Sequence, residues 1–236
     1  MNILILKNED FLNENTVKVC DRRAKHMLEI KKLSIGSTIN AGLINGKLGF
    51  AIVKDIEFMC VTLEVSLEEA PPVPLSLSLV MALPRPKVLK KILQTVASLG
   101  IKKLYLINSW KVEKSYWQSP LLIANNIHEQ LLLGLEQSCE TQMPEVIIRK
   151  RFKPFLEDEL ILIAKETRAL IAHPSETKFF PKEIEGNTIL AIGPEGGFTE
   201  YELHKFIEVG FEHLSLGRRI HKVETVIPLL VGKLFY

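Results

Sequence analysis

Residues 189–202 read ILAIGPEGGFTEYE, and residues 214–225 read LSLGRRIHKVET. In each stretch a short apolar strand pattern ends in a glycine-containing loop, and a helix pattern follows. Glycine has no Cβ and tolerates positive φ, so such a loop lets the backbone approach a ligand closely. Two loops of this kind, about one helix apart in the sequence, indicate neighbouring strand ends that converge on one pocket, where α/β sheets usually bind ligands.

The glycine pattern of the first loop excludes two common phosphate-binding motifs. Gly193, Gly196 and Gly197 do not form G-x-G-x-x-G, and no Gly-Lys-Ser/Thr follows them, as a Walker A loop would require. Either loop alone is equally well explained as turn punctuation after a strand. Together they predict a pocket of backbone amides and carbonyls that suits a flat heterocycle, with Arg218 and Arg219 beside it.

Residues 1–70 are predicted to form a small, mostly β domain. Asn45-Gly46 is a strong two-residue hairpin signal between strands expected at 37–44 and 47–53, and a further strand is expected at 58–65. A short helix is expected at 22–31. The segment APPVP at 70–74 then interrupts helix and sheet alike, since proline lacks an amide donor, and it marks the domain boundary.

From residue 75 to 236 strand and helix patterns alternate, which indicates an α/β domain. A helix is expected from Pro86 to a C-cap at Gly100, and Thr199 with Glu202 forms a capping box for a later helix. Short buried strands separated by helices predict a mainly parallel sheet covered on both faces. The expected strands are 75–83, 104–107, 146–148, 169–172, 188–192 and 213–216, and the remaining helices are 120–137, 155–165, 200–209 and 224–236.

Clusters of basic residues say more about possible partners than the net charge of the chain does. The net charge is +2 over 236 residues, so the overall charge does not indicate a nucleic-acid partner. Any one basic cluster is more simply a solvated face, but three of them, with the arginines beside the predicted pocket, favour a polyanion. The clusters are Arg22, Arg23, Lys25, Lys31 and Lys32; Arg85, Lys87, Lys90 and Lys91; and Arg149, Lys150, Arg151 and Lys153.

The cysteines are odd in number and widely spaced. Cys20, Cys60 and Cys139 contain no C-x-x-C pair, so we expect neither a disulfide framework nor a zinc site, and no other metal site is predicted. This usage fits a reducing cytoplasm. The N-terminus lacks the basic start of a signal peptide, and no stretch approaches the roughly 20 apolar residues that span a bilayer. A soluble, cytoplasmic protein is expected.

The two loops resemble the C-terminal part of the SPOUT methyltransferases, and most closely the RsmE family, whose members methylate N3 of a uridine in 16S ribosomal RNA of the small subunit. The family pattern I-G-P-E-G-G is matched completely at 192–197. The pattern L-G-x-R-I-L-R-x-E-T-A departs at His221, Lys222 and Val226. It is matched at Leu216, Gly217, Arg219, Ile220, Glu224 and Thr225.

The resemblance implies a fold and a set of partners. A SPOUT domain with a trefoil knot is expected at 75–236, and a PUA-like, RNA-binding β-barrel is expected at 1–70. The apolar C-terminal helix is equally well explained by burial within one chain, but the resemblance implies a homodimer. The expected substrate is 16S ribosomal RNA or the small ribosomal subunit, and no membrane partner is expected.

The resemblance also implies the site residues. S-adenosylmethionine is the expected cofactor, and it would be held by Ala172, His173, Pro174, Ile192, Gly193, Glu195, Gly196, Leu216, Gly217 and Ile220. The residues expected to face the target base, as catalytic groups, are Arg219, Lys222 and Glu224. The residues expected to bind RNA from the first domain are Arg22, Arg23, Lys25 and Lys32.

Several of these residues have structural explanations that the sequence leaves open. Glu224 suits the N-terminal dipole of a helix as well as it suits a general base. Arg219 could form a salt bridge with Glu195 or Glu224, and His221 is expected to point outward or into the core. Glu140 and Ser98 stand where the family has Arg and Glu. Two other functions stay open, the first of them because of Glu140 and Lys222. They are methylation of another RNA position, such as a ribose 2′-hydroxyl, and RNA binding by a non-catalytic ribosome assembly factor.

Overall fold

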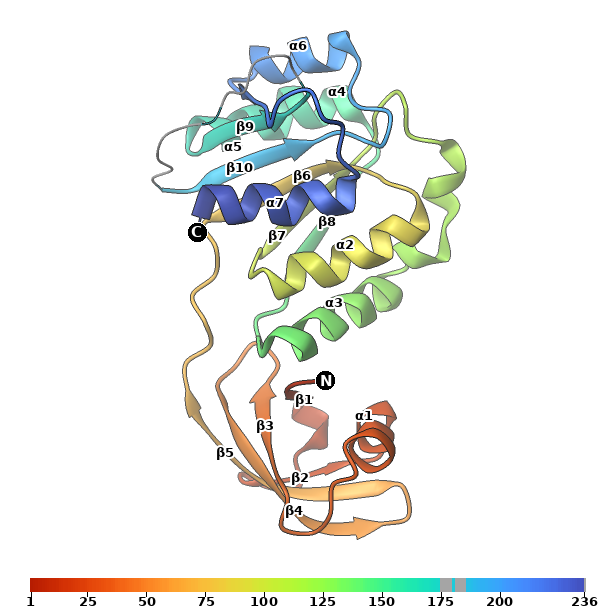
Figure 1. Cartoon of the computed structure of the whole chain (residues 1–236), viewed down its shortest axis with the longest axis vertical. Coiled ribbons are helices and arrows are strands. Elements are labelled where there is room, and N and C mark those ends of the chain that lie inside the picture. Colours follow the sequence, from red (N-terminus) through yellow and green to blue (C-terminus); the bar gives the residue numbers. More distant parts are fainter. Residues whose placement is uncertain (175–179, 181–185, 236) are drawn as a thin grey trace. The chain divides into compact units, whose positions relative to one another are not determined.

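A computed structural model of the chain describes residues 1–174, 180 and 186–235 (Figure 1). The chain divides into two compact units. The first consists of Met1–Val73 together with Leu131–Met143, and the second consists of Pro74–Gln130 and Pro144–Tyr236. The first unit therefore contains a segment, Leu131–Met143, that lies far beyond the APPVP linker and that the linker alone would assign to the second domain.

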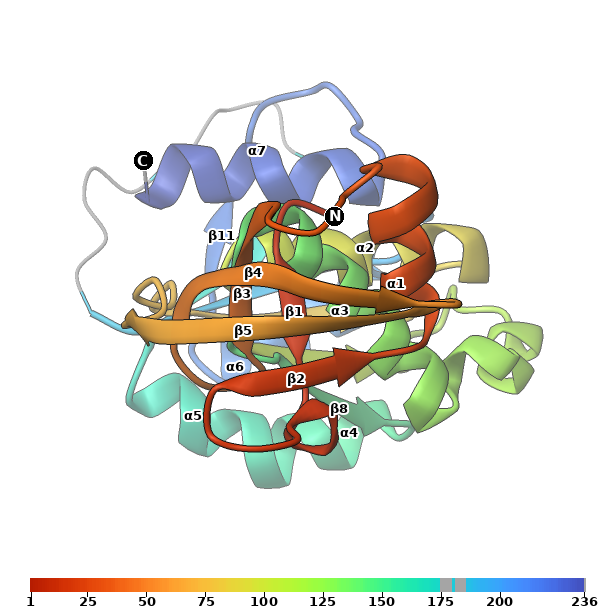
Figure 2. The same cartoon turned by 90° about the horizontal axis from the view of Figure 1, so that it is seen from below.

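The first unit is built on a five-stranded sheet in the order β1-β3-β4-β5-β2, whose strands are visible side by side in Figure 2. Strand β1 pairs with β3 in parallel, and the other neighbours are antiparallel. The predicted hairpin is confirmed, because Asn45 takes a positive φ of 57° between β3 and β4. The strand bounds are β1 Leu4–Leu6, β2 Thr16–Val19, β3 Thr38–Leu43, β4 Leu48–Glu57 and β5 Cys60–Glu69.

Three short helices lie in the N-terminal segment of this unit: η1 (Asn8–Asp10), α1 (Arg22–Lys25) and η2 (His26–Ile30). Helices α1 and η2 replace the single helix expected at 22–31, and Asp21 caps α1 by accepting a hydrogen bond from the Arg23 amide. Alternate strand residues such as Leu4, Val17 and Leu63 are fully buried and form one core.

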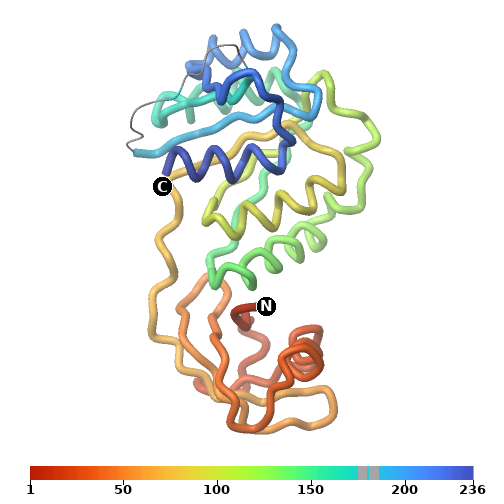
Figure 3. Tube along the Cα trace, in the orientation of Figure 1, coloured from red at the N-terminus to blue at the C-terminus, as the bar shows by residue number. Residues whose placement is uncertain are grey.

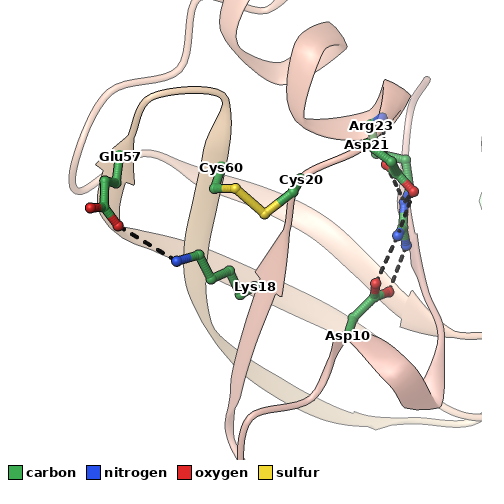
Figure 4. The surroundings of a disulfide bond; sticks show 7 residues. All are labelled: Asp10, Lys18, Cys20, Asp21, Arg23, Glu57 and Cys60. Atoms are coloured by element: carbon green, nitrogen blue, oxygen red, sulfur yellow. Dashed lines mark hydrogen bonds and ion pairs between the residues drawn. A yellow bond between two sulfur atoms is a disulfide. The ribbon is translucent and has the colours of Figure 1, made fainter.

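A disulfide joins Cys20 to Cys60, so the expectation that the cysteines form no disulfide is wrong (Figure 4). Strands β2 and β5 pair antiparallel with Val19 opposite Val61, which places the two cysteines opposite each other at the next position. The pairing depends on strand register, which their separation of 40 residues does not reveal. Cys139 is free.

The second unit has a six-stranded sheet in the order β11-β9-β10-β6-β7-β8, and every pair of neighbours is parallel. The predicted α/β fold with a parallel sheet is therefore confirmed. Strand β10 is buried along its whole length. The strands are β6 Leu77–Ala82, β7 Lys103–Ile107, β8 Glu145–Arg149, β9 Arg168–Ala172, β10 Thr188–Ile192 and β11 Glu212–Leu214.

Helices cover both faces of this sheet. Helices α2 (Pro86–Ser98) and α7 (Val223–Phe235) are far apart in the sequence but pack against each other on one face (Figure 3). Helices α4 (Phe152–Pro154) and α5 (Ile161–Lys165) lie on the other face, joined by η5 (Phe155–Leu160). Helix α6 (Glu200–Glu208) begins with the predicted capping box, in which Thr199 and Glu202 exchange hydrogen bonds.

The remaining helical segments follow β7. They are η3 (Lys114–Gln118), η4 (Pro120–Leu122) and α3 (Ala124–Ser138). The expected helix at 120–137 is thus divided at Ile123, which has extended backbone angles. The first residues of α3 belong to the second unit, and the residues from Leu131 onward belong to the first.

Candidate functional site

The carboxyl ends of β9 and β10 and the loop after β11 line one pocket of about 320 Å³ in the second unit. Because β9 lies between β10 and β11 and all three strands are parallel, their ends meet at the same edge of the sheet. All ten residues that we expected to hold the cofactor line this pocket. Its volume lies in the range of small-molecule sites, roughly 300–1,000 Å³.

The glycines of the first loop are required by close backbone packing. A Cβ on Gly193 would lie 3.0 Å from the Phe198 amide nitrogen and 3.3 Å from the Gly197 carbonyl carbon. Gly197 itself has a φ of +69°, which favours glycine. The loop therefore folds back on itself after β10 and leaves backbone groups at the pocket wall.

Two basic side chains from other strand ends brace the same loop. The Arg85 backbone amide and Nε both donate to Glu195 Oε1, at 3.3 and 3.1 Å. Lys111 Nζ donates to the Gly196 carbonyl oxygen at 2.7 Å. A Cβ on Gly196 would lie 3.0 Å from Lys111 Cδ, so this glycine makes room for the lysine. The loop is held in place from outside the pocket.

The start of α6 is tied to the same region through Glu202, which is buried. Its Oε2 accepts hydrogen bonds from the Thr199 amide and hydroxyl, at 2.8 and 2.9 Å. Its Oε1 accepts a third, from the Trp110 amide, at 2.7 Å. A carboxylate at a helix N-terminus is also favoured by the helix dipole. This one group therefore joins the loop after β7 to the loop after β10.

Arg219 lines the pocket and is exposed. Within the part of the chain that the structure describes, it forms no ion pair, and the two carboxylates we considered for it are engaged elsewhere. Glu195 pairs with Arg85 at 3.1 Å, and Glu224 lies 3.9 Å from Lys91. The guanidinium of Arg219 is thus a permanent positive charge at the pocket that no described carboxylate neutralises.

The other two residues expected to be catalytic are placed differently. Lys222 is exposed and does not line the pocket. Glu224 also lies outside the lining; it sits in the first turn of α7, where the helix dipole favours an acidic group. Of the three residues, only Arg219 lies at the pocket. His221, which we expected outward or in the core, lines the pocket instead.

His173 is the other imidazole of the pocket. Burial lowers its pKa below the usual 6.5, and the nearby His213 and Lys111 lower it further. Its carbonyl oxygen lies 3.1 Å from His213 Nε2. His173 is therefore neutral at pH 7, and its protonation would add a positive charge to a region where Lys111 is already positive.

The two arginines in the basic run of the first unit are paired with carboxylates, as Figure 4 shows for Arg23. The Arg23 guanidinium is 3% exposed and donates to Asp10 at 2.6 and 2.8 Å, to Asp21, and to the Ile5 carbonyl oxygen. The expectation that Arg23 binds RNA is wrong, because its guanidinium is buried and its donors are already bonded to Asp10, Asp21 and the Ile5 carbonyl oxygen.

The other three residues expected to bind RNA are at least partly exposed. Arg22 forms a bidentate pair with buried Glu136, at 2.7 and 3.0 Å, and this hydrogen-bonded pairing raises the pKa of Arg22. The Lys25 side chain is 66% exposed and lies 3.9 Å from Glu29. Lys32 is exposed and has a φ of 51°. Lys25 and Lys32 remain available to a polyanion.

Sequence reasoning did not assign several further pocket residues to the cofactor site. Leu214, Val223, Val226 and Leu230 also line the pocket. Leu230 lies beyond the second motif, and only its helical spacing from Val223 and Val226 places it on the same face of α7. The pocket is thus closed by a helix face as well as by loops.

Glu140 has a structural role in place of the RNA contact that its position suggested. It is buried, and its Oε1 accepts hydrogen bonds from the Thr141 and Gln142 amides, at 2.8 and 2.9 Å. Ser98, the other departure in this region, donates to the Thr95 carbonyl oxygen at the end of α2. Both side chains therefore complete local backbone structure.

Two absences hold for the described residues. Within 1–174, 180 and 186–235, no three His, Cys, Asp or Glu side chains are grouped so that they could hold a metal ion. Over the same residues, no helix has the length and apolar character needed to cross a membrane.

A family model and the most similar curated proteins that we compared agree on one protein family. The family model described as "RNA methyltransferase domain" matches residues 71–234. The ribosomal RNA small subunit methyltransferase E of Treponema pallidum (strain Nichols) is 31% identical over 231 residues, which covers 95% of this chain and 87% of that protein. Ribosomal RNA small subunit methyltransferase E 1 of Borreliella burgdorferi is 26% identical, with 95% and 93% covered.

A solved structure shows the same fold. The crystal structure of a ribosomal RNA small subunit methyltransferase E from Neisseria gonorrhoeae, bound to S-adenosyl methionine, superposes with a TM-score of 0.78. The match covers 99% of this chain and 98% of that one at 21% identity. Taken with the parallel sheet, the glycine loops and the pocket at their strand ends, these matches show that the chain belongs to the ribosomal RNA small subunit methyltransferase E family of RNA methyltransferases.

Proposed function

We propose that the protein transfers a methyl group from S-adenosylmethionine to N3 of a uridine in 16S ribosomal RNA of the small subunit. Family membership supports RNA methylation, and the relatives are named as small-subunit ribosomal RNA enzymes. The observation that carries the proposal is the pocket at three strand ends, with the unneutralised Arg219 in its lining.

The residues of the pocket fit the proposed cofactor. The backbone at Gly193 and Gly217 would contact the adenine, and Ile192, Leu216 and Ile220 would supply apolar contact to a flat ring. Gly217 has a φ of +101°, so its loop adopts a backbone conformation that favours glycine. The relative from Neisseria gonorrhoeae was solved with S-adenosyl methionine bound, which supports the same ligand here.

The cofactor, when bound, supplies an activated methyl group on a positively charged sulfur. The work left to the chain is to align the uracil with that methyl group, and orientation of this kind contributes about 7 kcal/mol or more in favourable cases. Arg219 would hold the uracil and favour its N3-deprotonated form by opposite charge. Its guanidinium carries five N–H donors in a planar fork, which suits either a uracil anion or a neighbouring phosphate.

The contacts of the site limit which residues could accept the proton from uracil N3. The described ionisable residues of the lining are His173, Glu195, Arg219 and His221. Glu195 is paired with Arg85, and an arginine does not accept a proton at neutral pH. His173 and His221 remain, and each is a suitable proton acceptor when neutral.

The assembly expected from the resemblance belongs to the same proposal. We propose that residues 75–236 form the SPOUT methyltransferase domain with its knot, that residues 1–70 form the PUA-like barrel that binds RNA, and that two chains form a homodimer. The apolar helix α7 supports the dimer, because Leu229 remains 42% exposed while Ile227, Leu230 and Val231 are buried within the chain. Sedimentation of the purified protein would test the dimer independently of activity.

Methylation of small ribosomal subunits from a strain that lacks the gene tests the proposed reaction. The subunits would be incubated with the protein and labelled S-adenosylmethionine, and the RNA would then be digested to nucleosides for mass spectrometry. We expect one N3-methyluridine per 16S RNA. A 2′-O-methylated nucleoside would support the alternative target, and RNA binding without methyl transfer would support an assembly factor.

A further inference from the structure

The loop after β7 places an exposed tryptophan next to the glycine loop of the pocket. Trp110 is 86% exposed, whereas Ser109 before it and Val112 after it are buried, at 3% and 8%. A single exposed apolar side chain is common and needs no explanation by itself. The loop that carries Trp110 is anchored at Trp110 and at Lys111, however, so the backbone that presents the indole is held in place.

The anchors of this loop belong to the same segment that forms the pocket wall. The Trp110 amide donates to Glu202 Oε1 at 2.7 Å, and Lys111 Nζ donates to the Gly196 carbonyl oxygen at 2.7 Å. Both partners follow β10 within ten residues of Ile192, whose side chain lines the pocket. Trp110 therefore lies beside the site that the proposed function assigns to the cofactor and the target base.

The surroundings of Trp110 are basic and aromatic. Lys111 and Lys114 are exposed, and Arg85 approaches the same glycine loop through Glu195. Trp117 lies in the next turn, with Lys150 Nζ 5.9 Å from its ring centre, and its Nε1 donates to Asn108. Two nearby carboxylates, Glu202 and Glu195, are occupied by the contacts described above, and Glu113 accepts a hydrogen bond from the Tyr116 hydroxyl.

We propose that Trp110 is a stacking platform for an unpaired nucleotide of the RNA substrate, next to the nucleotide that enters the pocket. Single-stranded RNA is recognised mainly by stacking of splayed bases on aromatic side chains beside positive charge. Lys111 and Lys114, which are exposed on the same loop and form no ion pair with a described residue, supply that charge. The proposal rests on the proposed function for the identity of the ligand, and it names a residue that fixes how the RNA lies at the site.

The Trp110 side chain can be replaced without removing the hydrogen bond that anchors the loop, because this bond comes from the Trp110 backbone. Because Glu202 accepts from the amide and not from the indole, Trp110→Ala leaves the loop anchor in place. RNA affinity would be measured by fluorescence anisotropy with a labelled single-stranded fragment of 16S RNA. We expect Trp110→Ala to weaken binding roughly tenfold, the loss typical of one base–aromatic stack, and Trp110→Phe to restore most of it. Cofactor affinity should not change.

Tyr201→Ala is the matched control, since Tyr201 is an exposed aromatic residue in α6 of the same unit at 57% exposure. It should bind RNA as the wild type does. The chain has two tryptophans, so in a Trp117→Phe background the intrinsic fluorescence reports Trp110 alone. We expect the RNA fragment to quench that fluorescence when it binds.

Wild-type RNA affinity in Trp110→Ala, or unquenched fluorescence while anisotropy shows RNA bound, would overturn the proposal. Loss of cofactor affinity in Trp110→Ala would also overturn it, because the residue would then be a structural support of the pocket. RNA binding is measured separately from methyl transfer, so failure of the proposed reaction would appear as unmethylated RNA with the stacking contact intact.

Discussion

Two basic segments of this chain have similar compositions but different environments. Residues 21–25 read DRRAK in the first unit, and residues 217–222 read GRRIHK in the second. In the first segment the Arg23 guanidinium is 3% exposed and is enclosed by Asp10 and Asp21. In the second, Arg219 is exposed at the pocket and, among the described residues, has no carboxylate partner.

The difference shows that the role of an arginine is decided by carboxylates that lie elsewhere in the sequence. Asp10 precedes Arg23 by 13 residues and reaches it from η1, and Glu136 reaches Arg22 from a segment 114 residues away. At the pocket the arrangement is reversed, because Arg85 and Lys91 occupy the two carboxylates that could have neutralised Arg219. The first segment stabilises a fold, and the second leaves a charge free for chemistry.

The largest expected effect is on the fold of the first unit. Arg23→Ala leaves Asp10 and Asp21 without their shared partner, and Asp10 is buried at 7% exposure. Removing one partner of a buried pair typically costs about 3–5 kcal/mol. The free energy of unfolding, measured by urea denaturation, should fall by that amount. Lys25→Ala, at an exposed position nearby, should change it by no more than about 0.5 kcal/mol. Equal values for the two variants would contradict the comparison.

The next effect is on turnover. Arg219→Ala should lower the methylation rate by about 10²-fold, as the loss of one donor to a developing anion does in other enzymes. The melting temperature and the affinity for S-adenosylmethionine should change little, since Arg219 makes no described ion pair. Single-turnover kinetics with saturating RNA provide the measurement. An early-melting variant with normal turnover would instead make Arg219 a structural residue like Arg23.

Two glycines of the first loop should differ in their effect on cofactor affinity. In Gly193→Ala the new Cβ would meet the backbone of Phe198 and Gly197, which cannot move without refolding the loop. In Gly196→Ala it would meet Lys111 Cδ, which belongs to a flexible side chain. Overpacking costs about 1–3 kcal/mol, so Gly193→Ala should weaken S-adenosylmethionine binding by about tenfold or more. Gly196→Ala should weaken it less, and the reverse order would show that the loop is not held as described.

The smallest effect concerns pH. The pKa of His173 is lowered, so the residue is neutral above its usual value of 6.5 and becomes charged only at lower pH. Protonation would add a positive charge to a pocket wall where Lys111 is already positive, and the proposed cofactor also carries a positive charge. Two like charges 4 Å apart in water repel by about 1 kcal/mol, so affinity should fall roughly fivefold as the pH decreases through the range below 6.5. His173→Asn should bind with a flatter pH profile than the wild type, and identical profiles for the two proteins would exclude this role.

Local signals in the sequence predicted much of the fold. The Asn45-Gly46 hairpin and the Thr199–Glu202 capping box are both present, because each depends on residues within a few positions of each other. Strands β1 and β2 have three and four residues, too few for a periodic pattern, and were not predicted. The glycine loops identified the pocket lining because parallel strands place their carboxyl ends at one edge.

What the sequence could not supply is the pairing between distant groups. The Cys20–Cys60 disulfide follows from the register of β2 against β5, and the burial of Arg23 follows from the position of η1. Lys111 was not among the residues expected at the site, although its ammonium group donates a hydrogen bond to the Gly196 carbonyl oxygen. Each of these contacts depends on tertiary structure and not on spacing along the chain.

Titration calorimetry of the full-length protein with S-adenosylmethionine tests the central claim, that the three strand ends form a cofactor site, most directly. We expect saturable heat with one cofactor per pocket, unchanged heat in Arg219→Ala, and weakened binding in Gly193→Ala. No heat at millimolar S-adenosylmethionine from a folded protein, or binding that Gly193→Ala leaves intact, would contradict it.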